Sequence, residues 1–402
     1  MKTLLIMQDY LPDLPGGIAN YAYRLCLDLS PDLEVLVPAY GDYHSFDQRQ
    51  PFPIHRRTIP IEPPAFMRES RWHWLRLPFI FYVAISQLLL FTWYGITTGK
   101  ARKIDKFLIG HLYLAPVGWF LSRWLKRPYG VILYGGELHR YFHWPFVRWP
   151  LVAALNQADF LVVITQFTRQ QYIQRGVRAD QRFVLVYPGV DTTRFQPSAD
   201  GRKIRERYDL VDKPLILTVA RLVDWKGHEL VLQALPLVLR ELPDLHYLIA
   251  GNGPYRPDLE GIVRKLELEE HVTFAGFVPD EELPAVYCSA DLFVQASREA
   301  GQNIAIEGFG IVFIEANACG VPVIGGRTGG TGEAIAHGVS GLRVDPYQPQ
   351  ELADAIVRLL HDQDYAQSLG QEGRARAVKE FEWSIQTERL REFLTFGSLF
   401  TL

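Results

Sequence analysis

Two cations and two carboxylates stand beside glycine-rich turns in the second half of the chain. Arg221 and Lys226 occur in ARLVDWKG, directly after the apolar run PLILTV. Glu307 and Glu315 lie in EGFGIVFIE, an otherwise apolar stretch. Cations at the carboxyl end of a buried strand could hold a diphosphate and stabilise it as it leaves. Buried carboxylates need partners, and the hydroxyl groups of a sugar and a ribose would supply them.

Glycines near these residues would let the backbone approach a ligand closely. Gly308 and Gly310 flank Phe309, near which we expect a helix to start with its free N–H groups available to an anion. The glycine-rich segments GGRTGGTGEAI (325–335) and PGG (15–17) also lie between an apolar run and a helical pattern. The sequence therefore indicates a ligand that carries phosphate.

Each of these features also has a purely structural interpretation. Arg221 and Lys226 could be solvated surface cations. Glu307 could cap a helix, Glu315 could be ion-paired, and PGG at 15–17 could be an ordinary turn.

Short apolar runs between helical patterns indicate the elements that would position these residues. Runs without alternation predict parallel strands buried on both faces, and two such sets predict two doubly wound α/β domains. The break falls in 187–201, which is rich in Pro, Gly, Asp and Thr. The expected strands are 3–7, 34–38, 105–110, 129–133, 159–165 and 183–187, followed by 214–219, 246–250, 272–276, 291–295, 321–326 and 341–344.

The sequence lacks the motifs of several classes of enzyme. GNGPYR at 251–256 has two glycines of a dinucleotide-binding fingerprint but Arg256 in place of the third, so hydride transfer is disfavoured. We find no P-loop and no paired-cysteine or H-E-x-x-H pattern, and we interpret DQD at 362–364 as a solvated turn. We therefore expect neither a metal site nor a bound cofactor.

Charge is distributed unevenly along the 402 residues. The composition is that of a soluble globular protein, with 48% apolar and 22% charged residues. Residues 1–190 hold 21 Lys and Arg against 13 Asp and Glu, whereas 191–402 hold 21 against 32. The basic half suggests an anionic partner. Nucleic acid is the weaker candidate because no dense basic run is present.

Cysteine usage and the N-terminus favour a cytoplasmic protein. Cys26, Cys288 and Cys319 sit in apolar surroundings without metal spacing, as expected of buried free thiols in a reducing compartment. The apolar run at 3–7 is too short for a secretory segment and suits a first buried strand.

Residues 77–99 contain no charged side chain and are long enough to span a bilayer. A span would separate the first two strands from those with which they must pair, so we favour a helix packed on the sheet. A helix that partly meets the membrane surface remains open, because cations flank the segment on both sides and RWLKRPYG (123–130) mixes Trp with cations in the same way.

In these motifs the chain resembles glycosyltransferase family four, the retaining nucleotide-sugar enzymes of GT-B fold. The motifs occur in family order and run almost continuously from residue 188 to 346, whereas the first half matches only in places. They are PGG (15–17), PGVDTTRF (188–195), R-x4-K-G (221–227), GNGPY (251–255), E-x7-E (307–315) with ANACGVPVIGG, and TGGTGEAI before GLRVDP.

The resemblance implies two Rossmann-like domains that face each other across a cleft. Residues 1–190 would bind the acceptor, 195–382 would bind the donor, and a last helix at about 383–402 would return to the first domain. The reaction would retain the anomeric configuration without a metal. The acceptor would be a glycan or a lipid-linked molecule, as for mannosyltransferases acting on phosphatidylinositol or polysaccharide precursors, and the protein could touch the inner face of the membrane through its basic first domain.

The resemblance also implies roles for individual residues. Arg221 and Lys226 would hold the diphosphate, and Glu315 would bind the ribose. Glu307, with the backbone of Gly308, Phe309 and Gly310, would bind the sugar.

The remaining implied contacts are to the base and the acceptor. Val278, in GFVPDEEL (276–283), would contact the base through its backbone, and Gly16 and Gly17 would border the phosphates and the acceptor.

One motif departs from the family pattern. The family usually has His-Gly-x-Asp/Glu after the fourth strand, whereas this chain reads YGGELHRY, with Tyr134 at the His position and Glu137 at the acid. Tyr134 can still donate a hydrogen bond, and His139 could fill the gap. A sugar-nucleotide epimerase of similar fold and an inactive donor-binding homologue remain alternatives.

Overall fold

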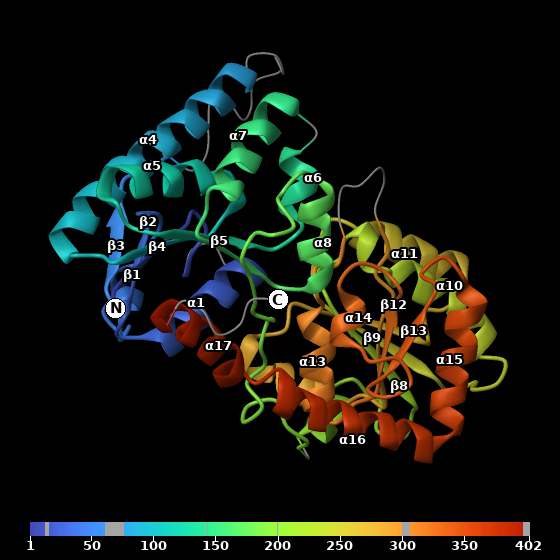
Figure 1. Cartoon of the computed structure of the whole chain (residues 1–402). Helices are drawn as coiled ribbons and strands as arrows, with labels where there is room; N and C mark the ends of the chain where they lie inside the picture. The colour runs from blue at the N-terminus through green and yellow to red at the C-terminus, as the bar shows by residue number, and fades with distance from the viewer. Residues whose placement is uncertain (13–15, 61–75, 143, 199, 300–305, 397–402) are drawn as a thin grey trace. The chain divides into compact units, whose positions relative to one another are not determined.

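The computed structural model divides the chain into two compact α/β units (Figure 1). It describes residues 1–402 except 13–15, 61–75, 143, 199, 300–305 and 397–402. The first unit comprises Met1–Ile164, Thr168–Val186 and the chain from Thr387 onward. The second comprises Thr165–Phe167 and Tyr187–Gln386.

The first unit is built on a seven-stranded parallel sheet of order β3-β2-β1-β4-β5-β6-β7. The order reverses at β1 and β4, which is the doubly wound pattern. Its strands are β1 (Thr3–Ile6), β2 (Leu33–Pro38), β3 (Ile54–Arg57), β4 (Lys106–Ile109), β5 (Tyr129–Leu133), β6 (Phe160–Val163) and β7 (Phe183–Leu185).

Strand β3 is the one strand of this sheet that the apolar pattern misses. Its sequence IHRR carries two arginines, and its side chains are only partly buried. Because β3 is an edge strand that pairs only with β2, it does not need the continuous apolar run of a central strand.

Helices cover both faces of the first sheet (Figure 1). In Figure 1, α4, α5 and α7 lie over one face, and α1 and α17 lie over the other. The helices of the N-terminal half are α1 (Gly17–Leu29), α2 (His44–Asp47), α4 (Arg76–Arg102), η2 (Leu112–Leu114), α5 (Ala115–Leu125), α6 (Glu137–Tyr141), α7 (Pro145–Asn156) and α8 (Gln166–Gln174).

The chain ends by returning to the first unit. In α17 (Trp383–Phe396), Leu390 and Phe393 are buried, and the Phe393 ring lies 5.0 Å from that of Phe160 in β6. Arg391 on the same helix donates to the carbonyl of Asp28 in α1.

The second unit is built on a six-stranded parallel sheet of order β10-β9-β8-β11-β12-β13. Its strands lie where the apolar runs predict them, so the sequence prediction of two parallel-sheet α/β domains is confirmed. They are β8 (Leu215–Val219), β9 (His246–Ala250), β10 (Val272–Gly276), β11 (Leu292–Gln295), β12 (Val323–Gly326) and β13 (Leu342–Val344).

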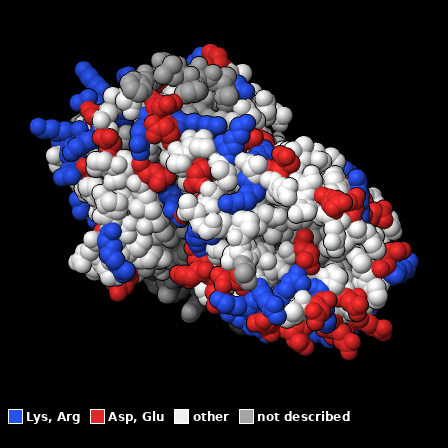
Figure 2. All heavy atoms as spheres, turned by 90° about the horizontal axis from the view of Figure 1, so that it is seen from below, with Lys and Arg blue, Asp and Glu red and all other residues white. Residues whose placement is uncertain are grey.

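Helices and short turns complete the second unit between and after these strands. On the face shown in Figure 2, acidic side chains gather at the lower right among Lys and Arg, in line with the acidic balance of this half of the chain. The helices are α9 (Gly201–Arg207), η3 (Asp224–Lys226), α10 (His228–Val238), α11 (Arg256–Lys265), η4 (Asp280–Glu282), α12 (Leu283–Cys288), α13 (Ile311–Ala318), α14 (Thr331–Ala334), α15 (Pro349–His361) and α16 (Gln363–Glu380). All three cysteines are free thiols; Cys26 and Cys319 are buried, as expected, whereas Cys288 is only partly buried.

Gly227 fixes the loop that follows β8. Its φ is +80°, and a Cβ there would lie 2.0 Å from the carbonyl oxygen of Ala296, just past β11. Only glycine fits this contact, because a side chain would strain both its own backbone and that of Ala296. The loop that carries Lys226 is thereby held against the end of β11.

We expect Gly227→Ala to lower the free energy of unfolding of the second unit by about 2 kcal/mol or more, because of the positive φ and the backbone clash. Gly261→Ala is the matched control, since Gly261 lies within α11 and a Cβ there meets no atom within 4 Å. The control should stabilise the protein by about 0.5–1 kcal/mol. Urea unfolding measures both changes, and an equally mild effect at Gly227 would contradict this account of the loop.

Candidate active site

The carboxylate of Glu307 lies at the centre of a buried polar cluster in the second unit. Its Oε2 accepts hydrogen bonds from Lys226 Nζ at 2.7 Å, Gln295 Nε2 at 3.0 Å and Ser297 Oγ at 3.2 Å. The side chains of Lys226 and Glu307 are only 16% and 10% exposed. Among the described residues, none donates to Oε1 of Glu307, so this oxygen can accept from a ligand.

The cluster forms where parallel strands end at the same edge of the sheet. Lys226 follows β8, Gln295 ends β11, and Ser297 comes two residues later. Glu307 lies in the loop before α13, as predicted, and the helix begins at Ile311 after Gly310, whose φ is +95°. Carboxyl ends of strands in an open α/β sheet are where such folds bind ligands.

Gln295 and Ser297 are site residues that the sequence reading missed. The sequence does carry a signal for them. The apolar run DLFVQ (291–295) ends in the polar Gln295, and the polar Ser297 follows two residues later. A polar residue at the carboxyl end of such a strand lies at the ligand edge of the sheet.

The second glycine-rich loop packs directly on the segment that carries Glu307. The N–H of Gly330 donates to the carbonyl of Glu307 at 2.9 Å. A Cβ on Gly329 would lie 2.1 Å from the Glu307 carbonyl, and one on Gly330 would lie 2.0 Å from that of Gly308. The two glycine-rich segments therefore form one continuous backbone surface beside the Glu307 carboxylate.

Glu315 lies on the second turn of α13 and has a different partner. Its Oε2 accepts a hydrogen bond from the hydroxyl of Tyr287 at 2.7 Å, and Tyr287 is fully buried. Burial raises the pKa of Glu315 to about 7, with a further upward contribution from Asp280. The two carboxylates thus occupy separate environments, one ion-paired and one readily protonated.

Arg221 and Val278 also lie in loops at the carboxyl ends of strands. Arg221 follows β8, is exposed, and makes no side-chain hydrogen bond with a described residue. Val278 lies between β10 and η4 and is partly buried. The structure therefore brings Lys226 to Glu307 but leaves the side chain of Arg221 apart from them.

Tyr134 lies just past β5 in the first unit. It is 7% exposed, its ring meets that of Tyr21 edge-on at 5.7 Å, and its hydroxyl has no partner among the described residues. His111, which the sequence reading did not single out, lies nearby with its ring centroid 6.4 Å from that of Tyr134. Burial lowers the pKa of His111.

Glu137 is occupied by structural hydrogen bonds. Its Oε2 accepts from the Tyr134 N–H at 2.9 Å and the Tyr172 hydroxyl at 3.2 Å, and Oε1 accepts from the Leu112 N–H at 3.3 Å. Burial nevertheless raises its pKa to about 7. Glu137 therefore fixes the turn between β5 and α6, while the side chain of His139 lies outside the described residues.

Gly16 and Gly17 stand at the start of α1. A Cβ on either would meet no atom within 4 Å, so the space beside them is open. Pro15 of the same motif lies outside the described residues.

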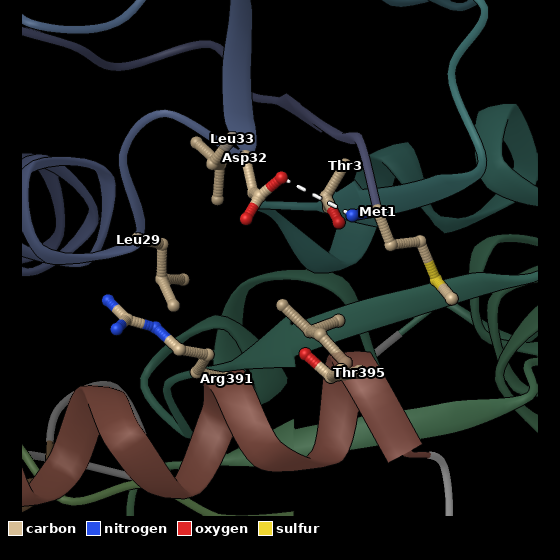
Figure 3. A pocket seen from close by; sticks show the side chains of 8 residues that line it. Met1, Thr3, Leu29, Asp32, Leu33, Arg391 and Thr395 are labelled. Atoms are coloured by element: carbon tan, nitrogen blue, oxygen red, sulfur yellow. Dashed lines mark hydrogen bonds and ion pairs between the residues drawn. The ribbon is translucent and has the colours of Figure 1, made fainter.

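The small hollow in Figure 3 is a poor candidate for the site. It lies at the amino ends of β1 and β2 beside α17, which is the opposite edge of the sheet from the ligand edge. The charged groups labelled there include Arg391 and an ion pair at 3.3 Å between the N-terminal amine and Asp32. Across the described residues, no group of three or more His, Cys, Asp and Glu side chains is arranged to hold a metal ion.

Solved structures of GT-B glycosyltransferases share this architecture. The HepE protein of Anabaena in complex with UDP matches with a TM-score of 0.80 and 22% identity, covering 98% of this chain and 100% of that one. The sucrose-phosphate synthase of Thermosynechococcus elongatus matches with a TM-score of 0.76 and 24% identity, covering 99% and 100%. The fold is therefore GT-B.

Sequence comparisons then define the family. The model described as Glycosyltransferase Family 4 matches residues 15–194, and that of Glycosyl transferases group 1 matches 200–376. A GDP-mannose-dependent alpha-(1-6)-phosphatidylinositol monomannoside mannosyltransferase of Mycolicibacterium smegmatis is 37% identical over 98% of both chains. A GDP-mannose-dependent monoacylated alpha-(1-6)-phosphatidylinositol monomannoside mannosyltransferase of Corynebacterium glutamicum is 27% identical over 98% of this chain and 97% of that one. This chain belongs to glycosyltransferase family 4, which confirms the resemblance.

We expect Lys226 and Glu307 to be strongly coupled in stability. In a double-mutant cycle, Lys226→Met and Glu307→Gln should show an interaction energy of about 1–3 kcal/mol, because each single change leaves a buried polar partner unsatisfied. The exposed pair Arg256 and Glu260 on α11, 2.8 Å apart, is the control and should couple by about 0.5 kcal/mol or less. Equal coupling in the two cycles, measured by urea unfolding, would show that the Glu307 cluster is not effectively buried.

Proposed function

We propose that this glycosyltransferase transfers a hexose from a nucleotide diphosphate sugar to a hydroxyl of a glycan or lipid-linked acceptor, with retention of the anomeric configuration and without a metal ion. The observation that carries the proposal is the Lys226–Glu307 pair, set between two glycine-rich segments at the carboxyl ends of β8 and β11.

The second unit has the groups that a nucleotide sugar needs. Lys226 gives one hydrogen bond to Glu307, so two of its three N–H groups can reach a diphosphate, and Arg221 adds an exposed cation. Glu307 Oε1 would accept from a sugar hydroxyl, beside the backbone of Gly308, Phe309 and Gly310. Glu315 would accept from the ribose, and the backbone at Val278 would contact the base.

GDP-mannose is the donor that we favour over a UDP-sugar. Relatives from Mycolicibacterium smegmatis and Corynebacterium glutamicum that align over nearly the whole chain are both described as GDP-mannose-dependent. Their described acceptor is a phosphatidylinositol mannoside, so we propose a lipid-linked mannoside acceptor held by the first unit near Gly16, Gly17 and Tyr134.

The proposed reaction exchanges one bond at the anomeric carbon for another. The bond from this carbon to the diphosphate oxygen breaks, and its electron pair leaves with the diphosphate, whose charge Arg221 and Lys226 stabilise. The acceptor oxygen attacks from the same face, and its proton passes to the departing diphosphate. Tyr134 can donate a hydrogen bond on the acceptor side, because its hydroxyl has no partner among the described residues.

Removing the cation should weaken donor binding. We expect Lys226→Ala to raise the Kd for GDP-mannose by about tenfold or more, because a charge-assisted hydrogen bond contributes about 1.5–3 kcal/mol. Lys265→Ala, an exposed lysine at the end of α11, is the control and should leave the Kd unchanged. Titration calorimetry with GDP-mannose and UDP-glucose measures both variants and ranks the two donors.

The same protein then tests the reaction. Incubation with a soluble mannoside acceptor and a chelator should give a product whose proton NMR spectrum shows the donor's anomeric configuration. Conversion of the donor to another nucleotide sugar without acceptor would indicate an epimerase instead, and failure to bind any nucleotide sugar would reject the proposed function.

Donor binding should strengthen as the pH rises through about 7. Below its raised pKa of about 7, Glu315 is mostly protonated in the free protein, whereas two ribose hydroxyls donate best to the ionised carboxylate. The Kd for GDP-mannose, whose diphosphate does not titrate in this range, should be about tenfold weaker at pH ~6 than at pH ~8. Glu315→Gln should abolish this dependence, and Glu137→Gln should keep it. If the Kd of Glu315→Gln for GDP-mannose still depended on pH, another titrating group would be responsible.

A further inference from the structure

Helix α4 has two apolar faces, and only one of them is packed in the first unit. Val83, Gln87 and Phe91 point inward and are at most 8% exposed. Gln87 donates to the carbonyl of Pro60 at 2.6 Å, and at the end of the helix Arg102 Nε donates to Glu34 Oε2 at 3.0 Å. The inner face of α4 is thus fixed on the rest of the unit.

The outer face of α4 is exposed from Phe81 to Trp93. Phe81, Ile85, Leu89 and Trp93 recur every fourth residue, so they form one stripe along the helix, with Tyr82 beside it. They are 48–66% exposed, and Trp93 alone is 63% exposed. Such a row of large apolar side chains is costly to leave in water.

The neighbouring helices extend this surface with aromatic side chains. Phe120 and Trp124 are exposed on α5, and Phe146 and Trp149 are exposed on α7, with Trp149 at 80%. The three helices cover the same face of the first sheet in Figure 1, and α5 packs against both α4 and α7. We call this set of side chains the aromatic face; it consists of Phe81, Tyr82, Ile85, Leu89, Trp93, Phe120, Trp124, Phe146 and Trp149.

Charge on the helices that carry the aromatic face is of one sign. The sequences of α4, α5 and α7 contain no Asp or Glu, while Arg and Lys occur in them and directly after them. Lys100, Lys103, Arg123, Lys126 and Arg148 are exposed at the helix ends and on α7. Trp and Tyr beside cations suit the headgroup level of an anionic bilayer, where each ring can lie half in lipid.

A membrane-spanning role for α4 conflicts with the sheet. By length and composition alone, Phe81–Arg102 qualifies as a span, and it is the one such helix in the described part of the chain. However, β1 before the helix pairs with β4 after it, and α4 packs closely on α5, where a Cβ on Gly95 would lie 2.8 Å from the side chain of Leu121. Both ends of α4 therefore return to one folded unit.

We propose that the aromatic face is a docking surface for the anionic cytoplasmic leaflet of a membrane, on which the protein lies without crossing it. A bilayer is favoured over a second copy of the chain, because a symmetric dimer through this face would set cations against cations. The surface belongs to the first unit and the donor site to the second, so the proposal goes beyond the transfer reaction. It would bring the enzyme to a lipid-linked acceptor.

Vesicle binding by the full chain tests the proposal. The protein, without donor, is co-sedimented with phosphatidylcholine vesicles that contain or lack phosphatidylglycerol. We expect binding to the anionic vesicles, and the triple variant Trp93→Ser, Trp124→Ser, Trp149→Ser should lower the apparent partition coefficient by about tenfold or more, because three exposed rings no longer enter the interface. Tyr347→Ser and Val378→Ser, at exposed apolar positions of the second unit, are the controls and should bind as wild type.

Charge reversal provides a second, independent measurement. Lys100→Glu, Arg123→Glu and Lys126→Glu together should abolish the preference for phosphatidylglycerol, whereas the same change at Arg240, Arg264 and Lys265 in the second unit should not. Urea unfolding of each variant, measured in parallel, shows whether the first unit is folded.

Three outcomes would overturn the proposal. They are wild-type protein that stays in the supernatant with both vesicle types, aromatic variants that bind as wild type, and a concentration-dependent dimer that the aromatic variants dissolve while vesicle binding is unchanged. The last result would assign the aromatic face to contact between copies of the chain.

Discussion

The burial of a single carboxylate organises the ligand edge of the second unit. Glu307 lies in a nearly closed environment, where Lys226, Gln295 and Ser297 all donate to one of its oxygens. These donors come from two different strand ends, so the carboxylate ties the loop after β8 to the end of β11. The glycine-rich loop at 329–330 closes the arrangement by packing on the backbone of Glu307 and Gly308.

This organisation would have a chemical advantage for the transfer proposed above. Because Lys226 and Glu307 hold each other in the folded unit, their side chains are already positioned at the ligand edge of the sheet. Glu315 behaves differently, since burial raises its pKa to about 7 although Tyr287 donates a hydrogen bond to its carboxylate. The two glutamates of E-x7-E therefore differ in their hydrogen-bond partners, although they stand on the same short segment.

The sequence predicts most of the fold and part of the candidate site, for identifiable physical reasons. Twelve of the strands are found because they carry apolar runs, which the nine central strands need since parallel strands inside a sheet are buried on both faces; the edge strands β7, β10 and β13 also carry such runs. Strand β3 is not predicted, because its sequence IHRR contains two arginines and no apolar run. Lys226, Glu307 and Glu315 are recognisable because charge is unusual after or within apolar runs.

Other features depend on spatial neighbours that no local pattern reveals. Gln295 and Ser297 are visible in the sequence as polar residues at the end of an apolar run, but their contact with Glu307 depends on the placement of β11 beside β8. The same holds for Glu137, which the sequence places at an acidic motif position and which three structural donors occupy. The sequence also left open whether the outer face of α4 is buried or exposed, since the pattern of an apolar helix is the same in both cases.

The return of α17 to the first unit has a consequence for how the protein is made. Leu390 and Phe393 belong to the core of a unit whose sheet is otherwise complete by Leu185. A ribosome must therefore synthesise the whole second unit before the first can bury Phe160 against Phe393. Until then the nascent first unit exposes part of its core, and a fragment that ends at the boundary near Val186 would never acquire that cover.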